Sequence, residues 1–214
     1  GCFGAVPGIR VAAALARANP KNRVLLVSTE ICSTHLEEEP TTENFVGAAI
    51  FADGSAAMVL GSGEDAGERR LWEVVRTAGQ RVAESLDMMY WKLTNAGWKL
   101  GLSRHIPDLI FDAIHPFTTR VLQSVPISEC DFPIHPGGKA ILLAIEKALS
   151  LDRDQTRHSW EVLRNYGNMS SSTVLFVLNL MKQDDRLRKW ACCMVFGPGL
   201  SIEGALLRRV GTDE

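Results

Sequence analysis

Three residues whose side chains could act together on a carbonyl compound stand in separate segments of the chain. Cys2 lies in Gly-Cys-Phe-Gly-Ala at the start, His135 begins His-Pro-Gly-Gly-Lys-Ala-Ile, and Asn168 stands in Tyr-Gly-Asn-Met-Ser-Ser-Ser. A cysteine thiolate is a nucleophile that can hold an acyl group. A histidine N–H and an asparagine amide can stabilise negative charge that develops on an oxygen. The segments therefore suggest acyl-transfer chemistry, provided that the fold brings them together.

Local sequence indicates how these side chains are held. A strand is expected to end at His135, and a helix is expected to follow Gly137 and Gly138, because apolar residues then recur at helical spacing: Ile141, Leu142, Ile145 and Leu149. The glycines leave space beside the imidazole. Cys2 precedes an alanine-rich helix predicted over residues 5–18. The positive end of that helix should stabilise a thiolate and so lower the pKa of Cys2.

The rest of the chain alternates between strand-like and helix-like segments. Residues 23–29 are a continuous apolar run of the kind that is buried on both faces of a sheet. The other strands expected are 56–61, 71–84 (one or two strands, with Trp72, Val74, Val82 and Ala83 buried), 128–134, 190–196 and 201–208. The other helices expected are 43–51 (capped by Thr42), 106–122, 159–165 and 171–182, and residues 86–104 are expected to be irregular. This alternation predicts an α/β fold.

A glycine-rich and acidic segment, residues 61–67, is the clearest boundary in the chain. We therefore expect two parts, residues 1–67 and residues 68–214. An acidic run, Glu37–Glu39, is expected to be a solvated surface. The last two strands are expected to pair around Gly197-Pro198-Gly199, which we interpret as a structural turn because a phosphate loop would need more glycines and a following lysine.

Composition narrows the classes of partner. The net charge of −2 over 214 residues gives no electrostatic reason to expect nucleic acid or an anionic membrane surface as partner. No apolar run reaches the roughly 18–20 residues of a membrane span, and no secretory leader is recognisable. Five cysteines without framework spacing favour reduced thiols, and so a cytoplasmic protein.

The motifs carry a resemblance to a known family. HPGGKAI, YGNMSSS, FGPGLSIEGALL and the N-terminal GCFGA resemble the type III polyketide synthases, the chalcone-synthase-like family, in order from Gly1 to about Arg209. HPGG followed by GNMSS is quite specific to that family. Known members are longer and have a duplicated thiolase fold. The resemblance implies a thiolase-like layered α-β-α fold, with an incomplete first half over residues 1–67 and a complete second half over residues 68–214.

The resemblance also implies roles for individual residues. Cys2, His135 and Asn168 match the family's catalytic triad. Phe51 and Leu100 match two gatekeeper positions, and plant members have phenylalanine at the second. The other substrate-binding positions implied are Cys32, Gly137, Gly138, Ser170, Gly197, Pro198 and Gly199. The family's GFGPG turn reads Val195-Phe196-Gly197-Pro198-Gly199 here, so its first glycine is missing.

The activity implied is a decarboxylative Claisen condensation. An acyl-CoA starter is held as a thioester on Cys2, malonyl-CoA loses CO₂, and donors from His135 and Asn168 stabilise the enolate. Loss of CO₂ generates the carbanion, so no carboxylate base is needed. The products implied are of the pyrone, resorcinol or chalcone type. No metal or cofactor beyond the CoA thioesters is expected, and the assembly implied is a homodimer.

Alternatives remain open at this point. A 3-ketoacyl-CoA or ketoacyl-ACP synthase of fatty acid elongation shares the same three residue types, but different residues usually follow its histidine. An inactive truncated fragment is the alternative without catalysis. Asn168 could be a simple turn residue, Asp53 is more readily a turn residue than an acid, and the other histidines are expected at the surface or in satisfied packing roles.

Two further expectations concern the chain as it stands. Because much of the first half is missing from the resemblance, residues 23–29 and 56–61 should leave sheet edges or faces exposed, and the isolated chain should be prone to aggregate. The family's basic residues for the CoA phosphates mostly precede the catalytic cysteine, so binding of CoA thioesters should be weak. Leu100 and Cys32 favour an aliphatic acyl starter.

Overall fold

The computed structural model describes residues 1–35, 41–62, 71–95 and 97–210. The helices are α1 (Ala5–Ala18), α2 (Thr42–Ile50), α3 (Ile106–Leu122), α4 (Lys139–Leu149), α5 (Arg153–Tyr166) and α6 (Thr173–Met181). Short 3₁₀ segments are η1 (Cys32–His35), η2 (Ile127–Glu129) and η3 (Ser170–Ser172). The strands are β1 (Arg23–Glu30), β2 (Gly54–Gly61), β3 (Trp72–Arg81), β4 (Met89–Thr94), β5 (Gly97–Leu102), β6 (Cys130–Asp131), β7 (Trp190–Gly197) and β8 (Ser201–Arg209).

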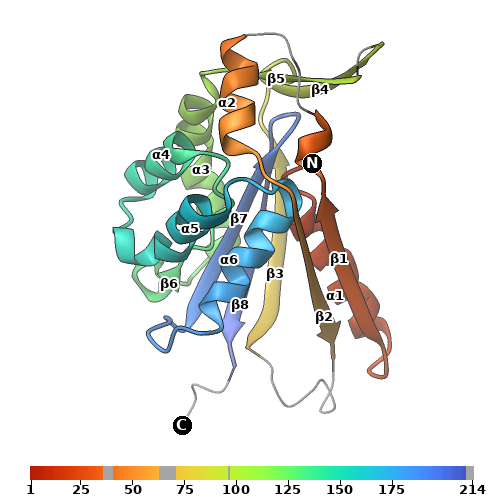
Figure 1. Cartoon of the computed structure of the whole chain (residues 1–214). Coiled ribbons are helices and arrows are strands. Elements are labelled where there is room, and N and C mark those ends of the chain that lie inside the picture. The colour runs from red at the N-terminus through yellow and green to blue at the C-terminus, as the bar shows by residue number, and fades with distance from the viewer. Residues whose placement is uncertain (36–40, 63–70, 96, 211–214) are drawn as a thin grey trace.

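A four-stranded sheet in the order β3-β8-β7-β6 forms the centre of the fold (Figure 1). Its β6–β7 pair is parallel, whereas β7–β8 and β3–β8 are antiparallel. Helices α1 and α6 pack on the face that carries Ala191, Cys193 and Val195, and α3 and α4 pack on the face that carries Cys192 and Met194. β7 is therefore buried on both sides, which explains its continuous apolar sequence.

Strands β1 and β2 form a separate antiparallel ribbon that lies beside α1, opposite the large sheet (Figure 1). β4 and β5 form a hairpin next to α2. The chain is thus α/β, with one helix layer on each side of the central sheet and the ribbon outside one of them. No helix within the described ranges is long and apolar enough to cross a membrane.

Most elements agree with the sequence predictions, and α1 and α3 agree at both ends. The β7–β8 hairpin forms as predicted around Gly197-Pro198-Gly199, and Cys192 and Cys193 are fully buried. The predicted boundary over residues 61–67 lies mostly outside the described residues, as does the acidic run Glu37–Glu39.

Four local predictions were wrong. Residues 86–104 are not irregular, because they hold the β4–β5 hairpin. Residues 128–134 form strand only at β6 and a single bridge from Ile134 to Met194, since Pro133 has no N–H to donate to a ladder. α5 begins at Arg153, earlier than predicted, behind an Asp152–Gln155 capping box. Ala83 is exposed, because β3 ends at Arg81.

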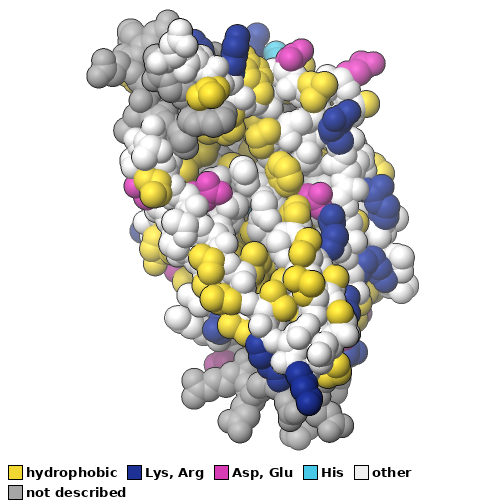
Figure 2. All heavy atoms as spheres, turned by 90° about the vertical axis from the view of Figure 1, so that its right-hand side faces the viewer, with side chains coloured by type: hydrophobic (Ala, Val, Ile, Leu, Met, Phe, Trp, Pro, Cys, Tyr) yellow, Lys and Arg dark blue, Asp and Glu magenta, His cyan; other side chains and the backbone are white. Residues whose placement is uncertain are grey.

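Two smaller corrections concern the N-terminal part. The cap of α2 is Thr41, whose hydroxyl accepts from Asn44 N at 3.2 Å, and not Thr42. β1 is not buried on both faces: its side chains alternate between partly buried and exposed, and Leu25 and Val27 are 64% and 56% exposed. Figure 2 shows hydrophobic side chains gathered on this side of the molecule.

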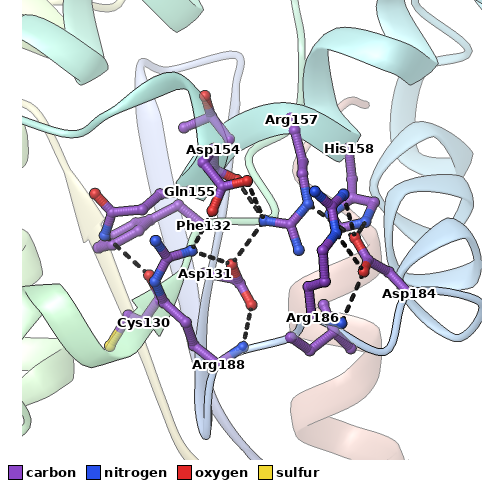
Figure 3. A network of polar contacts seen from close by, with 12 residues as sticks. Cys130, Asp131, Phe132, Asp154, Gln155, Arg157, His158, Asp184, Arg186 and Arg188 are labelled. Carbon is purple, nitrogen blue, oxygen red and sulfur yellow. Dashed lines mark hydrogen bonds and ion pairs between the residues drawn. The ribbon is translucent and has the colours of Figure 1, made fainter.

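A buried network of charges ties together the segments that lead into the site (Figure 3). Asp131 of β6 accepts from Arg157 of α5 at 3.2 Å and from Arg188, just before β7, at 2.9 Å. Asp184, in the loop after α6, accepts from Arg157 at 2.9 Å and lies 3.1 Å from His158. β6 leads to His135 and α5 leads to Asn168, so this network holds together the two segments that carry these residues.

Candidate active site

His135 is held by backbone hydrogen bonds at the end of the short strand segment. Its N–H donates to Met194 O at 2.8 Å, and its carbonyl accepts from Gly137 N at 3.0 Å. The side chain is 2% exposed, yet both ring nitrogens lack a hydrogen-bond partner among the described residues. Burial lowers the pKa of His135 to about 4, so the ring is neutral at physiological pH. A buried imidazole with both nitrogens unused is available to a ligand.

Gly137 leaves the space that such a ligand needs. A Cβ at this position would lie 3.6 Å from His135 Nε2 and 3.7 Å from Cδ2. Any side chain larger than glycine would therefore cover the edge of the imidazole. Gly138 plays a different part, because it packs near the Ile50 side chain at the end of α2.

Asn168 is fixed on every side at the turn after α5. Its N–H donates to Ile50 O at 2.8 Å and its carbonyl accepts from Ala52 N at 2.9 Å. The side-chain Oδ1 accepts from Ser170 N at 2.9 Å, and Nδ2 makes a long 3.4 Å contact to Gly137 O. The amide N–H₂ thus points to the glycine turn beside His135 and keeps donor capacity for a substrate oxygen.

The residue before Asn168 must be glycine. Gly167 has φ +71°, and a Cβ there would lie 2.7 Å from Ile50 O. A side chain at this position would push the turn away from α2 and break the bridge that joins Phe51 to Asn168.

Cys2 lies in the turn that precedes α1 and is linked to the Asn168 turn through Ser170. Burial raises the pKa of Cys2, a hydrogen bond with the Ser170 side chain lowers it, and the charge of Glu30 raises it, with a net upward shift. The predicted lowering of this pKa by the helix end was therefore wrong. The first helical residue is Ala5, and Gly4 is its cap without a side-chain hydrogen bond.

A chain of contacts links Cys2, Asn168 and His135, the three residues that the sequence singled out. Cys2 meets Ser170, Ser170 N donates to Asn168, and the Asn168 amide reaches the glycine turn that borders His135. In the free protein the arrangement holds a neutral thiol and a neutral imidazole, and not a standing thiolate–imidazolium pair.

The turn Gly197-Pro198-Gly199 packs against the segment that carries Cys2. A Cβ at Gly197 would overlap the Phe3 ring and lie 3.1 Å from Phe3 N, and a Cβ at Gly1 would lie 3.2 Å from Pro198 Cδ. The turn therefore sets the position of Cys2 from the opposite end of the chain.

The two gatekeeper positions implied by sequence both lie near Gly47 of α2. Phe51 is joined by its backbone to Asn168, and the Phe51 and Leu100 side chains both approach the Gly47 position to 3.9 Å. The Phe51 ring also lies 6.5 Å from the Trp91 ring, and Trp91 pairs with Leu100 across the hairpin. Trp91 was missed at the sequence level because the hairpin was not foreseen, although Met89, Trp91 and Leu93 alternate with Tyr90 and Lys92 in the sequence.

Cys32 is buried at the start of η1, where burial, together with the charges of Cys2, Glu30 and Asp53, raises its pKa to about 12. Asp53 accepts from Ser33 N at 2.8 Å and from Ser33 Oγ at 2.7 Å, so it is a turn residue as predicted.

A serine cluster that sequence reasoning did not assign holds the Asn168 turn in place. Ser28 Oγ lies 2.7 Å from Ser171 Oγ and 3.3 Å from Ser172 Oγ, and Ser171 Oγ also bonds to Glu30. The three consecutive serines, Ser170–Ser172, were the sequence feature that could have indicated this cluster. Among the described residues no group of His, Cys, Asp and Glu is arranged to hold a metal ion.

Comparisons with known proteins identify the family of this chain. The family described as "Chalcone and stilbene synthases, C-terminal domain" matches residues 73–211, and the corresponding N-terminal domain matches residues 1–64. "Probable polyketide synthase 1" of Dictyostelium discoideum is 38% identical over 218 residues, which is 98% of this chain and 7% of that protein. "Type III polyketide synthase A" of Arabidopsis thaliana is 33% identical over 97% of this chain and 56% of that protein.

A solved structure, the C-terminal type III polyketide synthase domain of Steely1, a type I/III hybrid from Dictyostelium, superposes with a TM-score of 0.94 at 37% identity. The match covers 98% of this chain and 60% of that domain. The chain belongs to the chalcone and stilbene synthase family and has its thiolase-like fold. It spans only about half the length of the plant relative and a small part of the Dictyostelium protein.

Proposed function

We propose that this chain carries the condensing site of a type III polyketide synthase. The observation that carries the proposal is the pair of unpartnered ring nitrogens on buried His135, next to the Asn168 amide and linked through Ser170 to Cys2. Two donors that converge on one small space are what a thioester enolate oxygen requires.

The protonation states of the free site define how the acyl group would be loaded. Neutral His135 has a ring nitrogen free to take the Cys2 proton as the sulfur attacks an acyl thioester. The thiolate that leaves the starter then takes that proton and becomes a free thiol, which returns the imidazole to its neutral form. The acyl group remains on Cys2 as a thioester.

The extension step would use the two donors in place of a base. The carbonyl oxygen of a malonyl thioester accepts from His135 N–H and from Asn168 Nδ2–H while CO₂ leaves. The enolate carbon attacks the Cys2 thioester, and the Cys2 thiolate departs. This chemistry calls for CoA thioesters as substrates and for no further cofactor.

The family match and the entrance residues support a proposal on substrate and assembly. We propose an acyl-CoA starter, malonyl-CoA extender units, a homodimer and a cytoplasmic setting. Leu100 beside Phe51 makes a less aromatic entrance than a pair of phenylalanines and favours an aliphatic starter. Pyrone, resorcinol or chalcone-type products would result from several extensions.

Small thioesters test the proposal without relying on contacts to the CoA phosphates. The chain is incubated with hexanoyl-N-acetylcysteamine, and acylation is located by mass spectrometry. Release of CO₂ from malonyl-N-acetylcysteamine is measured in parallel. Cys2→Ala should abolish loading, and Asn168→Ala should keep loading but slow decarboxylation by about 10²–10³-fold.

Cys193→Ala is the matched control, because Cys193 is fully buried in β7. It should change neither readout. Loading on a cysteine other than Cys2, or decarboxylation that survives in Asn168→Ala, would refute the assignment of the site.

A further inference from the structure

The two turns that carry the candidate donors are held to each other weakly by direct contact. His135 and Gly137 lie in one turn and Asn168 lies in the other. Asn168 Nδ2 donates to Gly137 O at 3.4 Å, which is longer than the about 2.7–3.2 Å of an ordinary N–H···O bond. An enolate oxygen that accepts from both donors requires a fixed spacing between these turns. A further contact must therefore set that spacing.

Ile50, the last residue of α2, contacts both turns. Its carbonyl accepts from Asn168 N at 2.8 Å. Its side-chain Cδ1 lies 3.8 Å from the position that a Cβ on Gly138 would occupy, directly after Gly137. The Ile50 backbone thus holds the Asn168 turn, and the Ile50 side chain packs at the turn of His135.

The end of α2 presents the carbonyl and the side chain of Ile50 together. Phe51 N donates to Gly47 O at 2.9 Å and closes the last helical turn, and Phe51 itself is extended, with φ −73° and ψ 144°. Ala52 N then donates to Asn168 O at 2.9 Å. The Asn168 backbone is therefore bonded to this segment through both its N–H and its carbonyl, so a shift of Ile50 also shifts Asn168.

Little freedom is left to Ile50 in this position. A Cβ at Gly167 would lie 2.7 Å from Ile50 O, so the Asn168 turn packs closely against this carbonyl. A β-branched side chain in a helix has one strongly preferred χ1 rotamer. Isoleucine can therefore act as a stiff spacer between the two turns.

We propose that Ile50 is a positioning residue of the condensing site. Its carbonyl and its side chain together set the spacing between the His135 and Asn168 donors, and it acts through these donors. The inference rests on the proposed function, because it gives Ile50 a part in stabilising the enolate.

The test measures kcat and KM for decarboxylation of malonyl-N-acetylcysteamine by the whole chain. Ile50→Ala should lower kcat about tenfold and leave KM nearly unchanged, whereas outright loss of one donor costs about 10²–10³-fold. Ile50→Val, which removes Cδ1 and keeps the β-branch, should cause a smaller fall. Ile50→Leu, which has δ-methyl groups, should retain most of the rate.

Val46→Ala is the matched control, because Val46 is a β-branched residue of α2, one turn before Ile50, and is 39% exposed. It should leave kcat unchanged. An equal fall in kcat for Val46→Ala and Ile50→Ala would show a general loosening of α2 and would overturn the positioning role.

A double-mutant cycle with Asn168→Ala tests whether Ile50 acts through the donor. In the Asn168→Ala background, Ile50→Ala should slow decarboxylation by less than about twofold. A tenfold fall in both backgrounds overturns the proposal. Decarboxylation that survives Asn168→Ala refutes the proposed function, whereas parental kcat in Ile50→Ala refutes the positioning role alone.

Hydrogen exchange at the Asn168 backbone amide tests the positioning role without relying on activity. Ile50→Ala should raise the exchange rate of this amide by about tenfold or more, and Val46→Ala should not. Unchanged exchange in Ile50→Ala overturns the proposal.

Discussion

Replacing Asp131 with asparagine tests whether the buried charge network stabilises the segment that leads to His135. The Asp131 side chain is 1% exposed. Its oxygens accept from Arg188 N at 2.7 Å, from Arg188 Nη1 at 2.9 Å and from Arg157 Nη1 at 3.2 Å. Asparagine has nearly the same shape, but it removes the negative charge and turns an NH₂ group towards these donors.

The expected loss follows from burial. Removing one partner of a buried ion pair typically costs about 3–5 kcal/mol, because the remaining charge stays desolvated. For a chain of this length 1 kcal/mol corresponds to roughly 2–4 °C in Tm. Asp131→Asn should therefore lower Tm by roughly 6–20 °C. Thermal and urea unfolding, followed by tryptophan fluorescence, measure this loss.

Asp154→Asn is the matched control. Asp154 pairs with the same Arg188 at 3.2 Å, but its side chain is 53% exposed. An exposed ion pair contributes at most about 1 kcal/mol. If Asp131→Asn costs no more free energy of unfolding than Asp154→Asn, the network does not stabilise this end of the fold.

Further predictions concern the site. Gly137→Ala should keep Tm but slow decarboxylation by about 10²-fold, because the new Cβ fits the fold yet lies 3.6 Å from His135 Nε2. Cys2 should be labelled slowly by iodoacetamide at pH 7 and faster only above about pH 9, since burial raises its pKa. Glu30→Gln should shift the pH dependence of labelling to lower pH, because the charge of Glu30 contributes to the raised pKa of Cys2. The free energy of unfolding should fall as the pH falls from about 6.5 to about 4. In this range His135 binds a proton in the unfolded chain, whereas the buried ring, with a pKa of about 4, does not. His135→Gln should remove up to about 3 kcal/mol of this change in the free energy of unfolding. Gly167→Ala should lower the free energy of unfolding, measured by urea unfolding, by about 1–3 kcal/mol, because Gly167 has φ +71°.

Four results would contradict this reasoning. They are a Gly137→Ala protein with full activity, a Cys2 thiol that labels rapidly at pH 6, a His135→Gln protein with an unchanged pH slope, and a Gly167→Ala protein as stable as the parent. The first result would show that the substrate oxygen does not bind beside His135 Nε2. The second would show that the helix end outweighs burial.

Sequence reasoning worked best where one strong pattern acted alone. α3 was predicted at both ends because a proline in its first turn and a regular apolar stripe mark it. The β7–β8 pair was predicted because a glycine–proline turn separates two apolar runs. Cys2, His135 and Asn168 were singled out from their motifs, and contacts through Ser170 and Gly137 link their segments in the structure; their catalytic roles stay a prediction.

The failures have physical causes that a single sequence does not display. The pKa of Cys2 depends on burial by segments far along the chain, and that burial outweighs the end of α1. The first turn of α5 is polar, so its start gave no apolar period even though the Asp152–Gln155 capping box was visible in the sequence. The exposed face of β1 follows from the absence of a covering neighbour among the described residues and could not be inferred from strand composition.

The linkage of Cys2 to the Ser170–Ser172 turn has a consequence for how the protein is made. The Ser28–Ser171 contact spans 143 residues, and the partner of Cys2 is comparably distant. Ribosomes add about 5–20 residues per second, so the thiol leaves the ribosome roughly ten seconds or more before the turn that shields it exists. During that interval Cys2 has the ordinary reactivity of an exposed cysteine. Oxidants and electrophiles in the cell would therefore damage this residue most readily on nascent chains, before burial protects it.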